Sequence, residues 1–132
     1  METNPIIYIS YPEAVLIHFE LMWLWGESRY GVFDQLLLKS ALARPQHAAA
    51  YEDAELLRQA ATLCFGLVKN HPWIGGNKRT ATALTQIFLR RNGFRFQASG
   101  VENLKLVHHI EADLWKVDEI EMWLRDHTSP LV

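Results

Sequence analysis

The sequence has a single cysteine, Cys64, so no disulfide can form within the chain. Cys64 lies in an apolar stretch with helical periodicity, where a small buried residue is expected, and a lone thiol fits a reducing cytoplasm. No uncharged run of 18 residues occurs, and the first ten residues lack the basic segment of a secretory leader. We therefore expect a cytoplasmic protein with no membrane partner.

Strong net charge is also missing. The 13 Lys and Arg residues and 15 Asp and Glu residues give a formal charge of −2, so there is no bulk positive charge for binding nucleic acid. We expect no direct nucleic-acid partner, and any basic site must be local. A chain of 132 residues without repeats or low-complexity linkers fits one domain spanning 1–132.

Apolar periodicity and helix-start signals predict an all-α bundle of five to seven helices. Three pairs have capping-box spacing and would each begin a helix: Ser10 with Glu13, Ser99 with Glu102, and Asp118 with Glu121. Further helices are expected over 34–44, 53–70 and 77–91, and a short strand over 94–97. His18 lies beside the apolar face of the first helix, where a packed, hydrogen-bonded histidine is expected rather than a catalytic one.

The densest group of polar residues lies at 71–79, in the order His-Pro-Trp-Ile-Gly-Gly-Asn-Lys-Arg. Gly75 and Gly76 permit positive φ angles and close approach of a ligand to backbone N–H groups. The helix predicted to follow directs its N–H groups and the positive end of its dipole at this loop, which favours phosphate. Lys78 and Arg79 add positive charge there. The loop lacks P-loop spacing, so the pattern predicts a phosphate site of another kind.

Each polar residue of the loop suits one part of a phosphoryl or nucleotidyl transfer. His71 is a general base near neutral pH, Arg79 can bind two phosphate oxygens at once, and Lys78 is a flexible point charge. Asn77 can either hold a phosphate oxygen or fix the loop, and Trp73 is expected to anchor the loop to the core. The candidate catalytic residues are thus His71, Lys78 and Arg79, and the candidate phosphate ligands are Gly75, Gly76, Asn77, Lys78 and Arg79.

At these residues the chain resembles the Fic/Doc family, whose signature is His-x-Phe-x-(Asp/Glu)-(Gly/Ala)-Asn-(Gly/Lys)-Arg. His71, Gly76, Asn77 and Arg79 match outright, and Lys78 matches the Doc (death-on-curing) toxin branch. Further similar segments are SRYG at 28–31, ALARPQ at 41–46, YED at 51–53, KNHP at 69–72, NKRTA at 77–81 and FLRRNG at 88–93. The resemblance therefore covers roughly residues 8–96. One position departs: Gly75 stands where the family carries the acid that holds the metal.

The resemblance implies a Fic/Doc-type helical bundle with a short flap or hairpin, which we place at 44–51 because Pro45 is expected to end the preceding helix. A plain interhelical loop is the alternative there. The resemblance also implies a toxin that transfers the γ-phosphate of ATP to a Ser or Thr of a translation factor, elongation factor Tu by analogy. The family's self-inhibitory helix has no match, so a separate antitoxin is the expected partner. ATP is the expected cofactor, whereas Gly75 leaves Mg²⁺ in doubt, and no metal ligand is assigned. Fic-type AMP transfer and a catalytically impaired domain that binds nucleotide or antitoxin are the alternatives.

Overall fold

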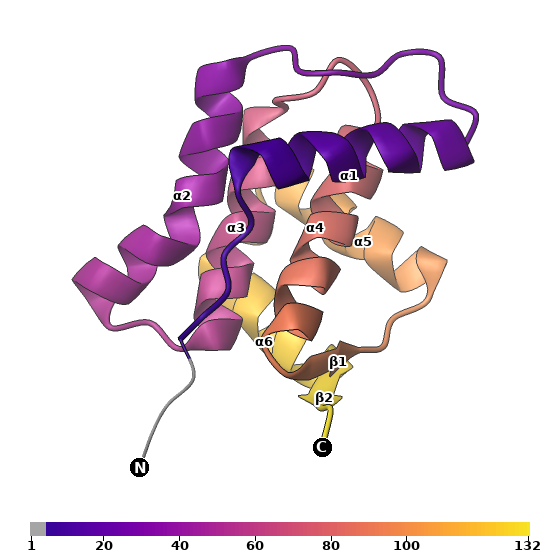
Figure 1. Cartoon of the computed structure of the whole chain (residues 1–132). Coiled ribbons are helices and arrows are strands. Elements are labelled where there is room, and N and C mark those ends of the chain that lie inside the picture. The colour runs from indigo at the N-terminus through magenta and orange to yellow at the C-terminus, as the bar shows by residue number, and fades with distance from the viewer. Residues whose placement is uncertain (1–4) are drawn as a thin grey trace.

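The computed structural model describes residues 5–132, which fold into six α-helices and two short strands (Figure 1). The predicted all-α class is confirmed, with a small two-stranded ribbon added. In chain order the elements are α1 (Tyr11–Leu24), α2 (Gln35–Glu52), α3 (Leu56–Asn70), α4 (Asn77–Arg91), β1 (Phe94–Phe96), α5 (Gly100–Glu111), α6 (Val117–His127) and β2 (Thr128–Pro130).

Helix α3 is the centre of the bundle, because it packs against α2, α4, α5 and α6. Ten of its fifteen residues are buried, so it carries apolar or small side chains on most of its circumference. Gly66 is one of these, and a Cβ there would come within 3.3 Å of the Ala41 Cα on α2. Helix α1 crosses the front of α4, where Figure 1 shows it spanning the bundle. The loop at 71–79 thus leaves the best-buried helix and enters a helix that α1 covers.

Most helix starts lie where the sequence places them. Ser10 and Ser99 close their capping boxes with Glu13 and Glu102. Asp34 accepts a hydrogen bond from the Leu37 N–H at 3.0 Å. The last helix is different. It begins at Val117, and the N–H of Lys116 donates to Glu119 at 2.8 Å.

The predicted capping box of Asp118 with Glu121 is therefore wrong. Both carboxylates instead form ion pairs with Arg58 of α3. The two acids thus help to join α6 to the central helix, a role that spacing along the chain does not reveal.

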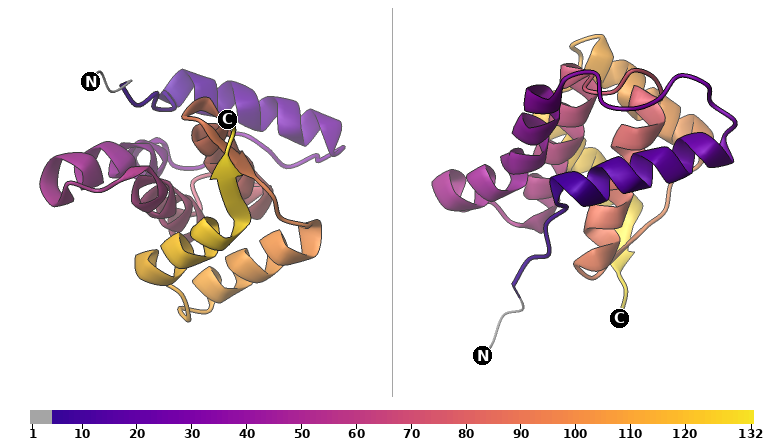
Figure 2. Two further views of the ribbon diagram at one scale, coloured as in Figure 1. Left: turned by 90° about the horizontal axis from the view of Figure 1, so that it is seen from below. Right: turned by 45° about the horizontal axis from the view of Figure 1, so that its top comes forward.

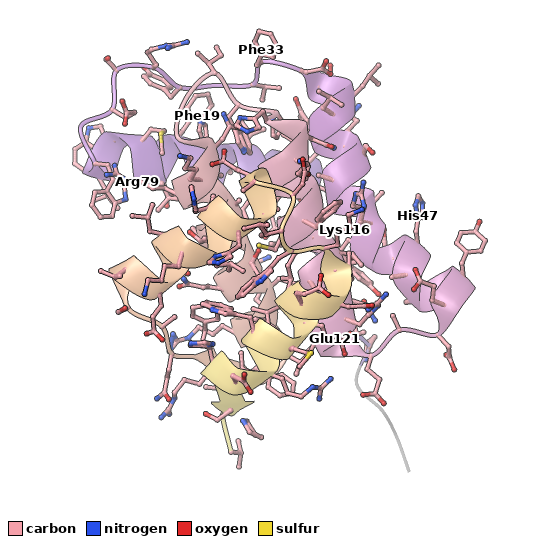
Figure 3. The ribbon with its side chains drawn as sticks, turned by 180° about the vertical axis from the view of Figure 1, so that it is seen from behind. Phe19, Phe33, His47, Arg79, Lys116 and Glu121 are labelled. Atoms are coloured by element: carbon pink, nitrogen blue, oxygen red, sulfur yellow. The ribbon has the colours of Figure 1, made fainter. Side chains whose placement is uncertain are left out.

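The prediction of a flap or loop at 44–51 is also wrong. Helix α2 continues through Pro45 to Glu52 and ends at Asp53, which has φ of 55°. Proline costs a helix one hydrogen bond, but Pro45 is itself buried together with Ala41 and Ala48, on a helix that packs along α3. That packing holds the segment helical, and the helix bends partway along (Figure 1). Because 44–51 is helical, it presents no free strand edge. His47 on this helix points away from the body of the protein (Figure 3).

The strand predicted at 94–97 is confirmed as β1. It pairs antiparallel with β2, with Arg95 opposite Ser129, and so ties the end of the chain to the segment that follows α4 (Figure 2, left). Within residues 5–132, no helix is long and apolar enough to cross a membrane.

Candidate functional site

The loop at 71–79 connects α3 to α4 through two residues in the left-handed region. His71 ends α3 with φ of 46°, and Gly76 precedes α4 with φ of 69°. At Gly76 any Cβ would overlap the thioether of Met22 on α1. The backbone angle therefore favours glycine there, and a larger residue would also have to displace the end of the Met22 side chain.

The α1–α2 connection (residues 25–34) lies against this loop, as Figure 2 shows on the right. The N–H groups of Phe33 and Asp34 donate to the Pro72 carbonyl at 2.8 and 3.2 Å, and the Ile74 N–H donates to the Gly31 carbonyl at 2.9 Å. Val32 and Trp73 form an isolated antiparallel bridge. The loop therefore gains backbone hydrogen bonds that neither flanking helix could supply.

Gly75 has no room for a side chain. A Cβ at this position would overlap the backbone oxygen of Arg29 in the α1–α2 connection. Ile74, which precedes Gly75, donates its N–H to the carbonyl of Gly31 in the connection. The loop and the connection therefore cannot separate without losing that hydrogen bond. A carboxylate at position 75 would thus fit only if the connection shifted.

Asn77 fixes the shape of the loop. Its Oδ1 accepts from the Trp73 N–H at 3.0 Å, and its Nδ2 donates to the Trp73 carbonyl at 2.9 Å. Trp73 is 2% exposed and stacks on His18 with ring centroids 4.0 Å apart. Of the two roles considered for Asn77, the observed contacts belong to loop closure.

His18 lies beneath the loop and is fully buried. Its Nε2 accepts from the Gly31 N–H at 3.0 Å, so the ring proton lies on Nδ1, 2.9 Å from the Thr80 hydroxyl. Burial lowers the pKa of His18 to about 4. The expected packed, hydrogen-bonded histidine is confirmed, and it joins α1, the α1–α2 connection and α4.

A cavity of about 320 Å³ opens in front of the loop. No side chain caps α4, so the first N–H groups of this helix have no partner within it. Lys78 is half exposed, and the Arg79 guanidinium stacks over the Trp25 ring at 4.3 Å, beside the start of α5 (Figure 3). The residues that line the cavity are Glu27, His71, Gly76, Asn77, Lys78 and Arg79.

A carboxylate from α5 also reaches the loop. Glu111, the last residue of α5, places Oε2 3.3 Å from Nε2 of His71 and Oε1 3.3 Å from Nζ of Lys78. Its side chain is only 26% exposed. An acid at a helix C-terminus opposes the helix dipole, so the helix itself gives no reason for a glutamate there. This unfavourable placement of an acid at a helix end is the only feature of the sequence that points to the contact of Glu111 with the loop.

Comparison with known proteins agrees with this geometry. A sequence model of the Fic/DOC family matches residues 8–89, which include the whole loop. The chain belongs to the Fic/DOC family. It is also 44% identical over 69 residues to a protein named Toxin Doc from Mycolicibacterium smegmatis. That match covers 51% of this chain and 53% of the relative, so the chain spans about half the length of the curated relative.

In this Fic/DOC protein, the predicted residues His71, Gly76, Asn77, Lys78 and Arg79 meet at one cavity. Gly75 is turned against the α1–α2 connection and does not line it. Sequence reasoning missed Glu27, Glu111, and Trp25 beneath Arg79. The contacts of these three residues depend on how the helices pack, and no motif contains them.

The donor groups around the cavity fit a metal that arrives with a nucleotide. Within residues 5–132, no three His, Cys, Asp or Glu side chains gather where they could hold a metal ion alone. Mg²⁺ does not need such a group, because it binds through one or two carboxylates together with substrate phosphates. Glu27 lines the cavity, and no cation of the described chain lies within ion-pair distance of its carboxylate, whereas Glu111 already contacts the His71 ring and the Lys78 ammonium.

Proposed function

We propose that this Fic/DOC protein is a Doc-type toxin that transfers the γ-phosphate of ATP to a Ser or Thr hydroxyl of a translation factor. Elongation factor Tu is the target by analogy, and a separate antitoxin is the partner that restrains the toxin in the cytoplasm. The observation that carries the proposal is the cavity where His71, Lys78 and Arg79 converge on the uncapped start of α4. The similarity to a protein named Toxin Doc supports the branch.

The cavity supplies the parts that phosphoryl transfer requires. Such reactions depend mainly on positioning and on positive charge opposite the migrating group. Lys78 and Arg79 provide the charge, and the free N–H groups of α4 can bind phosphate oxygens. Because Arg79 stacks on Trp25, its guanidinium plane is held in place while its N–H edges remain able to bind phosphate. His71 takes the proton of the attacking hydroxyl.

Glu27 is the residue that would hold Mg²⁺, together with the phosphates of the nucleotide. When bound, the metal supplies neutralising charge to the phosphate oxygens. In this proposal Glu27 takes the role of the acid that the family carries at the position of Gly75. The exposed side chains of Lys78 and Arg79 give the site positive charge of its own, so nucleotide can bind without the metal, although less tightly.

The test is to incubate the protein and a cell lysate with ATP labelled on the α- or the γ-phosphate. We expect label from the γ-phosphate alone on one host protein, and none with His71→Ala. The His71 side chain is about half exposed, so its removal should leave the far-UV circular dichroism unchanged.

Other patterns of label would overturn the proposal. Label from the α-phosphate would identify AMP transfer. No label in either case, with nucleotide still bound, would identify a binding domain without activity. The second result has a specific observation in its favour, because Asn77 is already committed to loop closure.

A further inference from the structure

We propose that Glu111 is a positioning residue that orients His71 for proton abstraction and links it to Lys78. This inference rests on the phosphoryl transfer proposed above. It begins from the two contacts of one carboxylate, with Oε2 3.3 Å from the His71 ring and Oε1 3.3 Å from the Lys78 ammonium. The base and a phosphate-binding cation are thereby held by the same side chain.

The contact favours one nitrogen of His71 as the base. It is an ion-pair contact of 3.3 Å rather than an aligned hydrogen bond, and the negative charge of the carboxylate beside Nε2 favours a proton on that nitrogen, because an ionised carboxylate can only accept. The lone pair is then on Nδ1. Within the described chain, no group forms a hydrogen bond with Nδ1 of His71, and the ring borders the cavity. Nδ1 is therefore the nitrogen available to a substrate hydroxyl.

The transfer step then balances in a simple way. The hydroxyl proton passes to Nδ1 while the hydroxyl oxygen forms a bond to the γ-phosphorus. The bond from that phosphorus to the bridging oxygen breaks, and its electron pair leaves with ADP. His71 becomes an imidazolium that faces the Glu111 carboxylate, which stabilises the new charge. This is the role of the third group in a nucleophile, base and orienting-group arrangement.

Two features argue that the contact is more than a surface ion pair. Glu111 is 26% exposed, so its carboxylate is partly shielded from water. It also lies at the end of α5 where the helix dipole is unfavourable to an acid, so its position is explained by its partners in the loop. A second pair on the same helix provides the comparison. At the other end of α5, Glu102 contacts His127 at 2.8 Å, away from the loop.

The experiment compares Glu111→Gln with Glu102→Gln in the full chain. Nitrogen NMR of the imidazole rings reports which ring nitrogen carries the proton. We expect Glu111→Gln to change the His71 signals and leave those of His127 unchanged, and Glu102→Gln to do the reverse. In the label-transfer assay, Glu111→Gln should lower kcat by about tenfold, which is part of the roughly 10²- to 10⁴-fold that general base catalysis contributes as a whole. KM for ATP should not rise, because a negative charge has been removed beside Lys78.

Glu111→Asp retains the charge on a shorter stem and should recover part of the lost kcat, which a purely structural role would not predict. The proposal is overturned if Glu111→Gln leaves the His71 signals and kcat unchanged. It is also overturned if that variant transfers label faster, because Glu111 would then obstruct the base. An absence of label with the unmodified protein would instead refute the proposed function, while the NMR comparison would still show whether Glu111 orients His71.

Discussion

The buried His18 makes a strong prediction about stability and pH. Its pKa is lowered by burial to about 4, whereas a histidine in an unfolded chain titrates near 6.5. Between these values the unfolded chain binds a proton that the native protein does not. The His18 contribution to the free energy of unfolding is therefore fully present above about pH 6.5 and is lost as the pH falls toward 4.

The magnitude follows from the difference between the two pKa values. Each unit corresponds to about 1.4 kcal/mol, so lowering the pH from about 7.5 to about 5 should remove roughly 2 kcal/mol through His18 alone. With a typical urea dependence for a small protein, this shifts the unfolding midpoint by about 1 M. The loss has a structural meaning, because His18 holds both Gly31 and Thr80 beside the loop.

The assay is urea unfolding followed by far-UV circular dichroism at several pH values, for the unmodified protein and for His18→Gln. Glutamine keeps an oxygen that can accept from the Gly31 N–H but does not titrate. The variant should be less stable at pH 7.5 and should lose less stability on acidification. Parallel pH curves for the two proteins would refute the reasoning.

His127 provides a matched control of opposite sign. Burial acts to lower its pKa, but the Trp123 carbonyl and the Glu102 carboxylate outweigh that effect and raise it above the ordinary value. A raised pKa in the native protein contributes stability below about pH 6.5, and this contribution is lost as the pH rises through the native pKa. His127→Gln should therefore remove some stability at low pH and little at high pH.

Three further predictions concern the loop and its cavity. Gly75→Asp should lower the free energy of unfolding by about 1–3 kcal/mol, because a Cβ at position 75 overlaps the Arg29 carbonyl. Gly100→Ala is the control and should not lower it, because a Cβ there meets open space. Equal urea midpoints for the two variants would contradict this prediction. Arg79→Ala should weaken binding of a non-hydrolysable ATP analogue by about 1.5–3 kcal/mol, measured by calorimetry, and an unchanged affinity would show that Arg79 does not bind phosphate. Glu27→Gln should reduce the gain in analogue affinity that Mg²⁺ produces, and an undiminished gain would exclude Glu27 as the metal ligand.

The parts of the fold that could be predicted are those decided by neighbouring residues. Ser10 and Ser99 cap their helices through bonds that span three positions, so the sequence alone contains both partners. The loop between α3 and α4 is local in the same sense. Gly76, the two cations and the helix that follows are contiguous, and the structure brings them to one cavity.

The errors arise where distant segments decide the outcome. Pro45 has a local cost of about 3 kcal/mol in a helix, and only its burial against the core explains why α2 continues. Likewise, Arg58 forms ion pairs with Asp118 and Glu121 across the bundle. Glu111 at the end of α5 contacts His71 at the end of α3, although α4 and β1 separate them in the chain. Such contacts depend on how helices pack, and periodicity within one helix cannot reveal them.

The position of the α1–α2 connection explains why the loop of this chain has glycine at position 75. The α1–α2 connection lies so close to the loop that Arg29 occupies the space of a side chain at position 75. The same connection brings Glu27 to the cavity and places Gly31 where it bonds both Ile74 and His18. An acid could return to position 75 only if the connection moved away, and the hydrogen bonds of Gly31 and the position of Glu27 would then be lost together. Restoring the family's acid at position 75 should therefore not restore the family's metal site in this chain.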